Sequence, residues 1–161
     1  MKTLIYFASK TGATAESVEK LVKLLEEHHH EVTVIRHDRK TKLPDIKKFD
    51  CILVGGSVHA GKVQKPIVKF VTSNEAVLKK KKTGLFLGCL TPTDKAVQYF
   101  DDNYPAPVVG HAVAKGLFGA GVYYDKMNFI ERYILQRVTG KIGNFTAFLD
   151  ENIKQFVKEL E

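Results

Sequence analysis

The sequence contains no tryptophan and only two cysteines among its 161 residues. Two cysteines are too few for a disulfide framework or a cysteine-based metal centre, so we expect no metal site. Cys51 and Cys89 both stand beside apolar residues in expected strands, where we expect small buried side chains. The chain also lacks any run near the ~20 apolar residues of a membrane span, and the apolar stretch 4–8 gives way to SKTG too early for a secretory signal. We therefore expect one cytoplasmic domain over residues 1–161.

Acidic residues are the minority among the charges. Lysine and arginine number 25 against 18 aspartates and glutamates, which gives a formal net charge of +7 and a sequence pI of about 9.3. Such a field favours anionic partners and allows contact with a membrane surface, but it does not by itself indicate nucleic acid, and we expect none bound. The lysine run 79–82 and the histidines 28–30, at an expected helix end, are interpreted as solvated surface.

The most informative stretch lies near the start of the chain. Residues 2–8 (KTLIYFA) predict a strand, residues 9–14 (SKTGAT) a hydroxyl-rich loop, and residues 15–27 an amphipathic helix with apolar positions at helical spacing. A loop that leaves a strand for a helix N-terminus offers unpaired backbone N–H groups and the positive end of the helix dipole. The pattern predicts an anion site and favours a phosphate monoester, although an ordinary turn with a threonine cap is the alternative.

Strands and helices alternate along the rest of the chain. Further strands are expected at residues 31–36, 51–55, 85–90 and 108–118, with a turn or short helix within 41–48 and a glycine corner at 119–121. Further helices are expected at 65–78, 96–104, 127–138 and 145–160. This alternation predicts an α/β domain with a doubly wound, five-stranded parallel sheet in the order 2-1-3-4-5 and helices on both faces.

Three loops leave the carboxyl ends of neighbouring strands in that arrangement: residues 9–14, 56–62 and 89–94. Ligands of open α/β sheets bind at this edge, where strand order reverses, so one loop could hold a phosphate and the others a flat ring. Gly56, Gly61 and Lys62 also satisfy the GxxxxGK outline of a nucleoside-triphosphate loop. Val63 follows where a Mg²⁺-binding serine or threonine is required, which argues against a triphosphate.

Every defined position of SKTGAT matches the [ST]xTGxT loop of flavodoxins, and the chain resembles that FMN-binding family over nearly its whole length. The resemblance implies FMN as cofactor. It implies that the phosphate is held by Ser9, Lys10, Thr11, Gly12, Ala13 and Thr14. It also implies that the isoalloxazine ring is enclosed by Ser57, Val58, His59, Ala60, Gly61, Cys89, Leu90 and Thr91. None of these ring-side residues is one of the aromatics that many flavodoxins stack on the flavin, so the ring should be more open.

Two segments resemble a subgroup that includes menaquinone-dependent protoporphyrinogen dehydrogenase. They are residues 53–61 (LVGGSVHAG) and the aromatic, charged helix expected at 123–138. The resemblance leaves two redox roles open. The chain could be an electron carrier for a redox partner protein or quinone-type acceptor, or an FMN-dependent oxidoreductase acting on a small molecule such as a porphyrinogen. A flavin-free binding module of the same fold is a third reading, and no residue is assigned a catalytic role.

Individual side chains of the expected site leave further alternatives. Lys10 could offset phosphate charge or point to solvent. His59 could donate a hydrogen bond or relay protons at the ring edge, or be an exposed loop histidine without a redox role. Cys89 is interpreted as strand packing rather than as a redox thiol.

Overall fold

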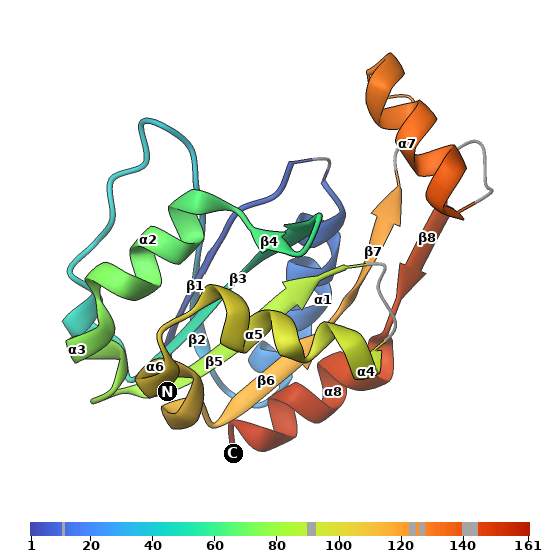
Figure 1. The fold of residues 1–161 in the computed structure, drawn as a ribbon. Helices are drawn as coiled ribbons and strands as arrows, with labels where there is room; N and C mark the ends of the chain where they lie inside the picture. The colour runs from blue at the N-terminus through green and yellow to red at the C-terminus, as the bar shows by residue number, and fades with distance from the viewer. Residues whose placement is uncertain (11, 90–92, 123–124, 126–127, 140–144) are drawn as a thin grey trace.

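The computed structural model describes residues 1–161 except 11, 90–92, 123–124, 126–127 and 140–144. Its central sheet contains the parallel strands β1 (Lys2–Phe7), β2 (Glu31–Arg36), β3 (Cys51–His59), β5 (Lys82–Gly88) and β6 (Ala114–Leu117). Their spatial order is β2-β1-β3-β5-β6 (Figure 1). The short strand β4 (Lys62–Val63) pairs antiparallel with the end of β3. Counted without β4, the five parallel strands have the predicted order 2-1-3-4-5, and the predicted fold class is confirmed.

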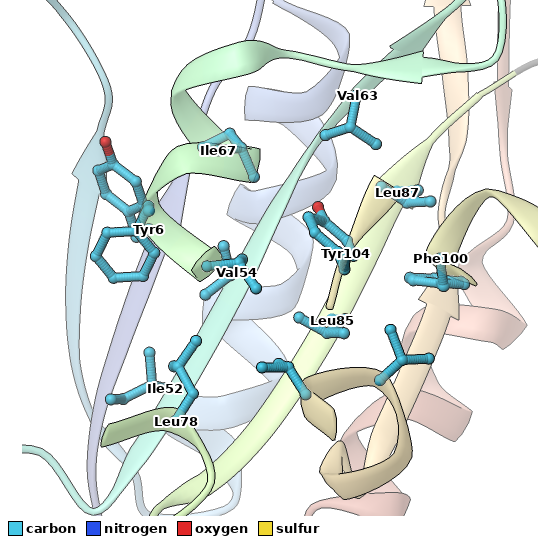
Figure 2. Close-up of a cluster of buried hydrophobic side chains, with 14 of the residues drawn as sticks. Tyr6, Ile52, Val54, Val63, Ile67, Leu78, Leu85, Leu87, Phe100 and Tyr104 are labelled. Atoms are coloured by element: carbon cyan, nitrogen blue, oxygen red, sulfur yellow. The ribbon is translucent and has the colours of Figure 1, made fainter. Parts of the chain in front are cut away.

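Side chains of the strands alternate between two apolar layers. Leu4 and Tyr6 of β1 face one layer, and Ile5 and Phe7 face the other. One layer is covered by α1 (Ala13–Glu27) and α8 (Asp150–Glu159). The opposite layer is covered by the helices α2 (Lys65–Ser73), α3 (Glu75–Leu78), α4 (Thr93–Ala96), α5 (Gln98–Asn103) and α6 (Ala106–His111). Figure 2 shows the core of this second layer, where Ile67 of α2 and Phe100 of α5 gather over the strand residues Val54 and Leu85.

Helix α8 packs through one aromatic side chain. The ring of Phe156 lies 6.3 Å from the ring of Phe86 and 5.2 Å from that of Phe118, in edge-to-face geometry. A Cβ atom at Gly84 would lie 2.6 Å from Phe156, and one at Gly116 would lie 2.9 Å away. The two glycines therefore leave the space on the sheet that this ring fills.

Several predicted boundaries were wrong. Residues 108–111, predicted as the start of the fifth strand, belong to α6, because Pro105 and Pro107 favour the first positions of a helix. Residues 145–148, predicted as helix, form β8 (Phe145–Phe148), which pairs antiparallel with β7 (Gly119–Val122). Residues 119–121, predicted as a glycine corner, instead form most of β7, and the chain enters this strand at Gly119, whose φ is 74°. The predicted helix at 65–78 is divided at Asn74, and the short helix expected within 41–48 is a 3-10 turn at Ile46–Lys48.

One of the three histidines predicted at the surface is buried. His30 is only 8% exposed, and its Nδ1 lies 2.8 Å from the hydroxyl of Thr3. The chain turns straight from α1 into β2, and this turn brings His30 against β1. At the end of the lysine run, Lys82 begins β5 and its amine donates to the carbonyl of Leu160.

Helix α7 (Phe129–Thr139) lies between β7 and β8 in the chain and stands beyond the ends of these two strands, away from the central sheet (Figure 1). Among the described residues, no helix has the length and apolar character needed to cross a membrane. Both cysteines are buried and reduced, as the sequence predicts.

Candidate functional site

The loop after β1 has an organised backbone. The Gly12 N–H donates to the hydroxyl of Ser9 across 3.0 Å, and Gly12 adopts a φ of 101° as the N-cap of α1. The N-cap residue Gly12 has no side chain with which to cap the helix, and the first-turn N–H groups and the positive end of the dipole face the loop. Ala13 and Thr14 begin the helix and are buried. The predicted Thr11 lies outside the described residues.

Two contacts fix this loop to the sheet. The guanidinium of Arg36, at the end of β2, donates to the Ser9 carbonyl at 2.9 Å. The Ala8 N–H donates to the carbonyl of Gly55 in β3 at 3.2 Å. The loop is therefore held from both neighbouring strands.

Thr14 joins the first loop to the second. Its hydroxyl donates to the hydroxyl of Ser57 across 3.3 Å. Gly88, the last residue of β5, lies beside the Thr14 hydroxyl, since a Cβ atom at Gly88 would be 3.1 Å from its oxygen. The start of α1 and the ends of β3 and β5 thus converge at one point on the carboxyl edge of the sheet.

The second predicted loop is a β-hairpin. Ser57, Val58 and His59 lie in β3, and Ala60 and Gly61 form the turn, both with positive φ. Lys62 and Val63 then return as β4. A triphosphate loop would instead run directly into a helix at this lysine, so the structure overturns the GxxxxGK alternative.

Two side chains hold this hairpin in place. The Asn103 amide of α5 donates to the Gly61 carbonyl at 3.1 Å and accepts from the Val63 N–H at 3.0 Å. The side-chain amide oxygen of Gln64 (Oε1) accepts from the Ser57 N–H at 2.9 Å. The sequence pattern did not indicate a role for Asn103 or Gln64, because neither residue belongs to a recognisable motif. In the third loop, Cys89 is buried after β5, and the predicted Leu90 and Thr91 lie outside the described residues.

Helix α7 reaches the first loop through its N-terminal residues. The Glu131 N–H donates to the Asn128 side chain at 2.8 Å, and the Asn128 N–H donates back to the Glu131 carboxylate at 3.1 Å. This reciprocal capping box leaves the other carboxylate oxygen of Glu131 in an ion pair with Lys10. Of the two alternatives for Lys10, the exposed one agrees with the structure, because 58% of its side chain is accessible while its amine pairs with Glu131; a role as phosphate partner stays a prediction. The Asn-x-x-Glu spacing was the sequence signal for the capping box that begins this helix.

The same cluster acts on His59. Burial lowers the pKa of His59, the Lys10 ammonium lowers it further, and the Glu131 carboxylate raises it. The hydrogen bond from Lys10 lowers the pKa of Glu131. The first loop, the hairpin and α7 therefore share one electrostatic cluster. Among the described residues, no group of three or more histidines, cysteines and acids could hold a metal ion.

This fold and edge geometry agree with the comparisons to known proteins. The family model for the flavodoxin domain matches residues 4–146, and the chain belongs to this family. A search of curated protein sequences found no match.

Solved structures show the same fold at low sequence identity. Oxidised flavodoxin 1 from Bacillus cereus is 16% identical, with a TM-score of 0.60, over 99% of this chain and 97% of that chain. A short-chain flavodoxin associated with a non-canonical PDU bacterial microcompartment is 15% identical, with a TM-score of 0.61, over 99% and 96%. Rubredoxin:oxygen oxidoreductase from Desulfovibrio gigas is 10% identical, with a TM-score of 0.56, and the match covers 99% of this chain but 37% of that one.

Proposed function

We propose that this chain is an FMN-binding electron-transfer protein acting as one cytoplasmic domain. The observation that carries the proposal is the N-terminus of α1, which begins at a glycine N-cap behind a hydroxyl-bearing loop at the carboxyl edge of the sheet. Membership of the flavodoxin domain family supports the same cofactor. When bound, FMN supplies transfer of one or two electrons.

In this proposal the first loop holds the FMN phosphate. The backbone N–H groups of residues 10–14 and the hydroxyls of Ser9, Thr11 and Thr14 act as donors, and Gly12 allows close approach of the backbone. Ser57 to Gly61, with Cys89, Leu90 and Thr91, border the ring. The Asn103 and Gln64 hydrogen bonds keep the hairpin in register beside it.

The partner in this proposal is a redox protein or a quinone-type acceptor. A second candidate function is an FMN-dependent oxidoreductase of the protoporphyrinogen dehydrogenase type. It is favoured by one observation, the contact of Glu131 in α7 with the first loop, because this contact places a helix beside the site, where a small substrate would bind.

The cofactor is tested by titrating the purified protein with FMN and with riboflavin, followed by flavin fluorescence. FMN should bind at least about tenfold more tightly, because several phosphate hydrogen bonds are lost with riboflavin. Thr14→Val should weaken FMN binding and leave riboflavin binding nearly unchanged. Thr72→Val, which removes an exposed hydroxyl on α2, is the matched control. Equal affinity for both flavins, or no FMN binding, would overturn the proposal.

Carrier and enzyme are separated by mixing the reduced protein with menaquinone analogues and with a flavodoxin reductase, and by mixing the oxidised, FMN-loaded protein with protoporphyrinogen. Rapid electron exchange with the reductase or with a menaquinone analogue, without turnover of protoporphyrinogen, would support the carrier. Turnover of protoporphyrinogen would support the enzyme.

A further inference from the structure

Helix α7 exposes an unusual amount of apolar surface. Phe129 is 84% exposed, Ile130 68%, and Tyr133 and Ile134 55% each. Their spacing of one and four residues places all four side chains on one side of the helix. Other large exposed apolar residues, such as Val97 and Val113, are scattered along other segments. A contiguous apolar patch of this kind marks an interaction surface rather than a part of the core.

The contacts of α7 orient this patch away from the body. Glu131 lies on a different side of the helix from the apolar residues and pairs with Lys10 of the first loop. The helix stands beyond the ends of β7 and β8 and outside the two layers that cover the sheet (Figure 1). The apolar side chains are therefore carried on a projecting element.

Positive charge accompanies the patch. The guanidinium of Arg137 lies 5.7 Å from the centre of the Tyr133 ring, and Arg132 directly precedes Tyr133 in the same helix. With Lys10, these arginines outnumber the two acidic residues beside them, Glu131 and Asp125. The whole chain carries a formal charge of +7. Large apolar side chains bordered by arginines are the composition of helices that lie in the interface of an anionic membrane.

We propose that α7 docks the protein on an anionic lipid membrane by inserting Phe129, Ile130, Tyr133 and Ile134 into the interfacial region. A projecting apolar helix enters lipid without a matching cavity, whereas a protein partner would need a complementary groove, and this favours the membrane as occupant. The 11 residues of α7 are too few to span a bilayer, so the helix lies on its surface. The ion pair with Lys10 then brings the first loop close to the lipid. This last consequence rests on the proposed function, because it would bring FMN within reach of a lipid-dissolved acceptor.

The test is co-sedimentation with vesicles of phosphatidylcholine alone and of phosphatidylcholine mixed equally with phosphatidylglycerol. The FMN-treated protein should bind the mixed vesicles more tightly, and high salt should weaken that binding. The double variant F129S/I134S should lose at least about tenfold in vesicle affinity. The matched control is V97S/V113S, which replaces two exposed apolar residues away from α7 and should bind as the parent does.

Circular dichroism and FMN titration check that both variants remain folded. Equal vesicle binding by F129S/I134S and the parent, or no preference for phosphatidylglycerol, would overturn the proposal. A parent dimer that F129S/I134S converts to a monomer would overturn it in favour of a second copy on this face. Failure to bind FMN with vesicle binding intact would defeat only the proposed function, and FMN binding without vesicle binding would defeat only this inference.

Discussion

Gly12 shows how one residue shapes the first loop. Its φ of 101° lies where side-chain-bearing residues are strained, and this conformation turns the chain from the loop into α1. The Ser9 hydroxyl accepts from its N–H and stabilises the same turn. Because this backbone conformation requires glycine, Gly12 links the stability of the fold to the shape of the proposed phosphate site.

Replacing this glycine should weaken both properties. Gly12→Ala is expected to lower the free energy of unfolding by about 1–2 kcal/mol and to weaken FMN binding. Gly110→Ala is the control, because Gly110 is in α6 with open space around its Cβ position, and it should gain about 0.5–1 kcal/mol. Urea unfolding without flavin measures both. Unchanged stability of Gly12→Ala would show that the loop accepts another conformation.

His30 gives the fold a predictable response to acid. Burial lowers the pKa of His30, and the positive N-terminal amine and His28 lower it further. The unfolded chain therefore binds a proton more readily than the native state, so this residue's stabilising contribution is present above about pH 6.5 and is lost as pH falls through the lowered pKa. His30→Gln should lose less stability than the parent between about pH 7.5 and about pH 5.5 in urea titrations. His29→Asn, at the exposed neighbouring position, should keep the parental slope, and equal slopes for all three proteins would refute this role.

At the scale of elements, the capping box of α7 fixes a charge relationship between three segments. Glu131 bonds its own helix terminus through Asn128 and pairs with Lys10, and both charges act on His59. Glutamine also serves in a capping box, so Glu131→Gln removes the charge while keeping the helix start. The variant Glu131→Gln therefore removes the charge through which α7 acts on the hairpin, without disturbing the structure of either element.

Removing the two charges should shift His59 in opposite directions. Glu131→Gln should lower the pKa of His59, because a carboxylate that favours the imidazolium is lost, and Lys10→Gln should raise it. Proton NMR titration of the His59 ring signal measures both shifts. Glu75→Gln, which breaks the Glu75–Lys79 pair on α3, is the charge-matched control and should leave that signal unchanged. Shifts of the same sign in both variants would contradict the cluster.

At the scale of the whole molecule, aromatic side chains on two helices have opposite roles. Phe156 of α8 is 1% exposed and fills the space over Gly84 and Gly116, whereas Phe129 of α7 contributes little to the core. Phe156→Ala should lower the free energy of unfolding by about 3–5 kcal/mol, while Phe129→Ala should change it by less than about 0.5 kcal/mol. Chemical denaturation followed by circular dichroism measures both. A large loss from Phe129→Ala would show that α7 packs against the body and would also weaken its assignment as a docking helix.

The parallel sheet and the first loop were predictable because their signals are local. Strands such as 31–36 and 51–55 are short runs of apolar or β-branched residues between clear breaks, and SKTGAT is a contiguous motif. Residues 108–111 and 145–148 were assigned wrongly because short apolar runs fit a helix and a strand equally well. Their true state follows from which surface they can cover, and sequence periodicity does not carry that information.

The supports of the site were not predictable for a related reason. Lys10 meets Glu131 across 121 positions of the chain, and the Val63 N–H meets Asn103 across 40. Each partner is an ordinary polar residue whose role depends on the packed fold. His30 likewise reads as surface beside two other histidines until the turn into β2 brings it to Thr3.

The position of α8 in the chain also has a consequence for biosynthesis. β1 can pair with β2 and β3 once His59, the last residue of β3, has left the ribosome. The layer that contains Phe86 and Phe118, however, is completed by Phe156, which follows every strand of the main sheet. During translation, those two aromatic rings therefore remain without their third partner while the sheet is already able to assemble. Nascent chains that stop before α8 should expose this apolar face and be the species that chaperones bind.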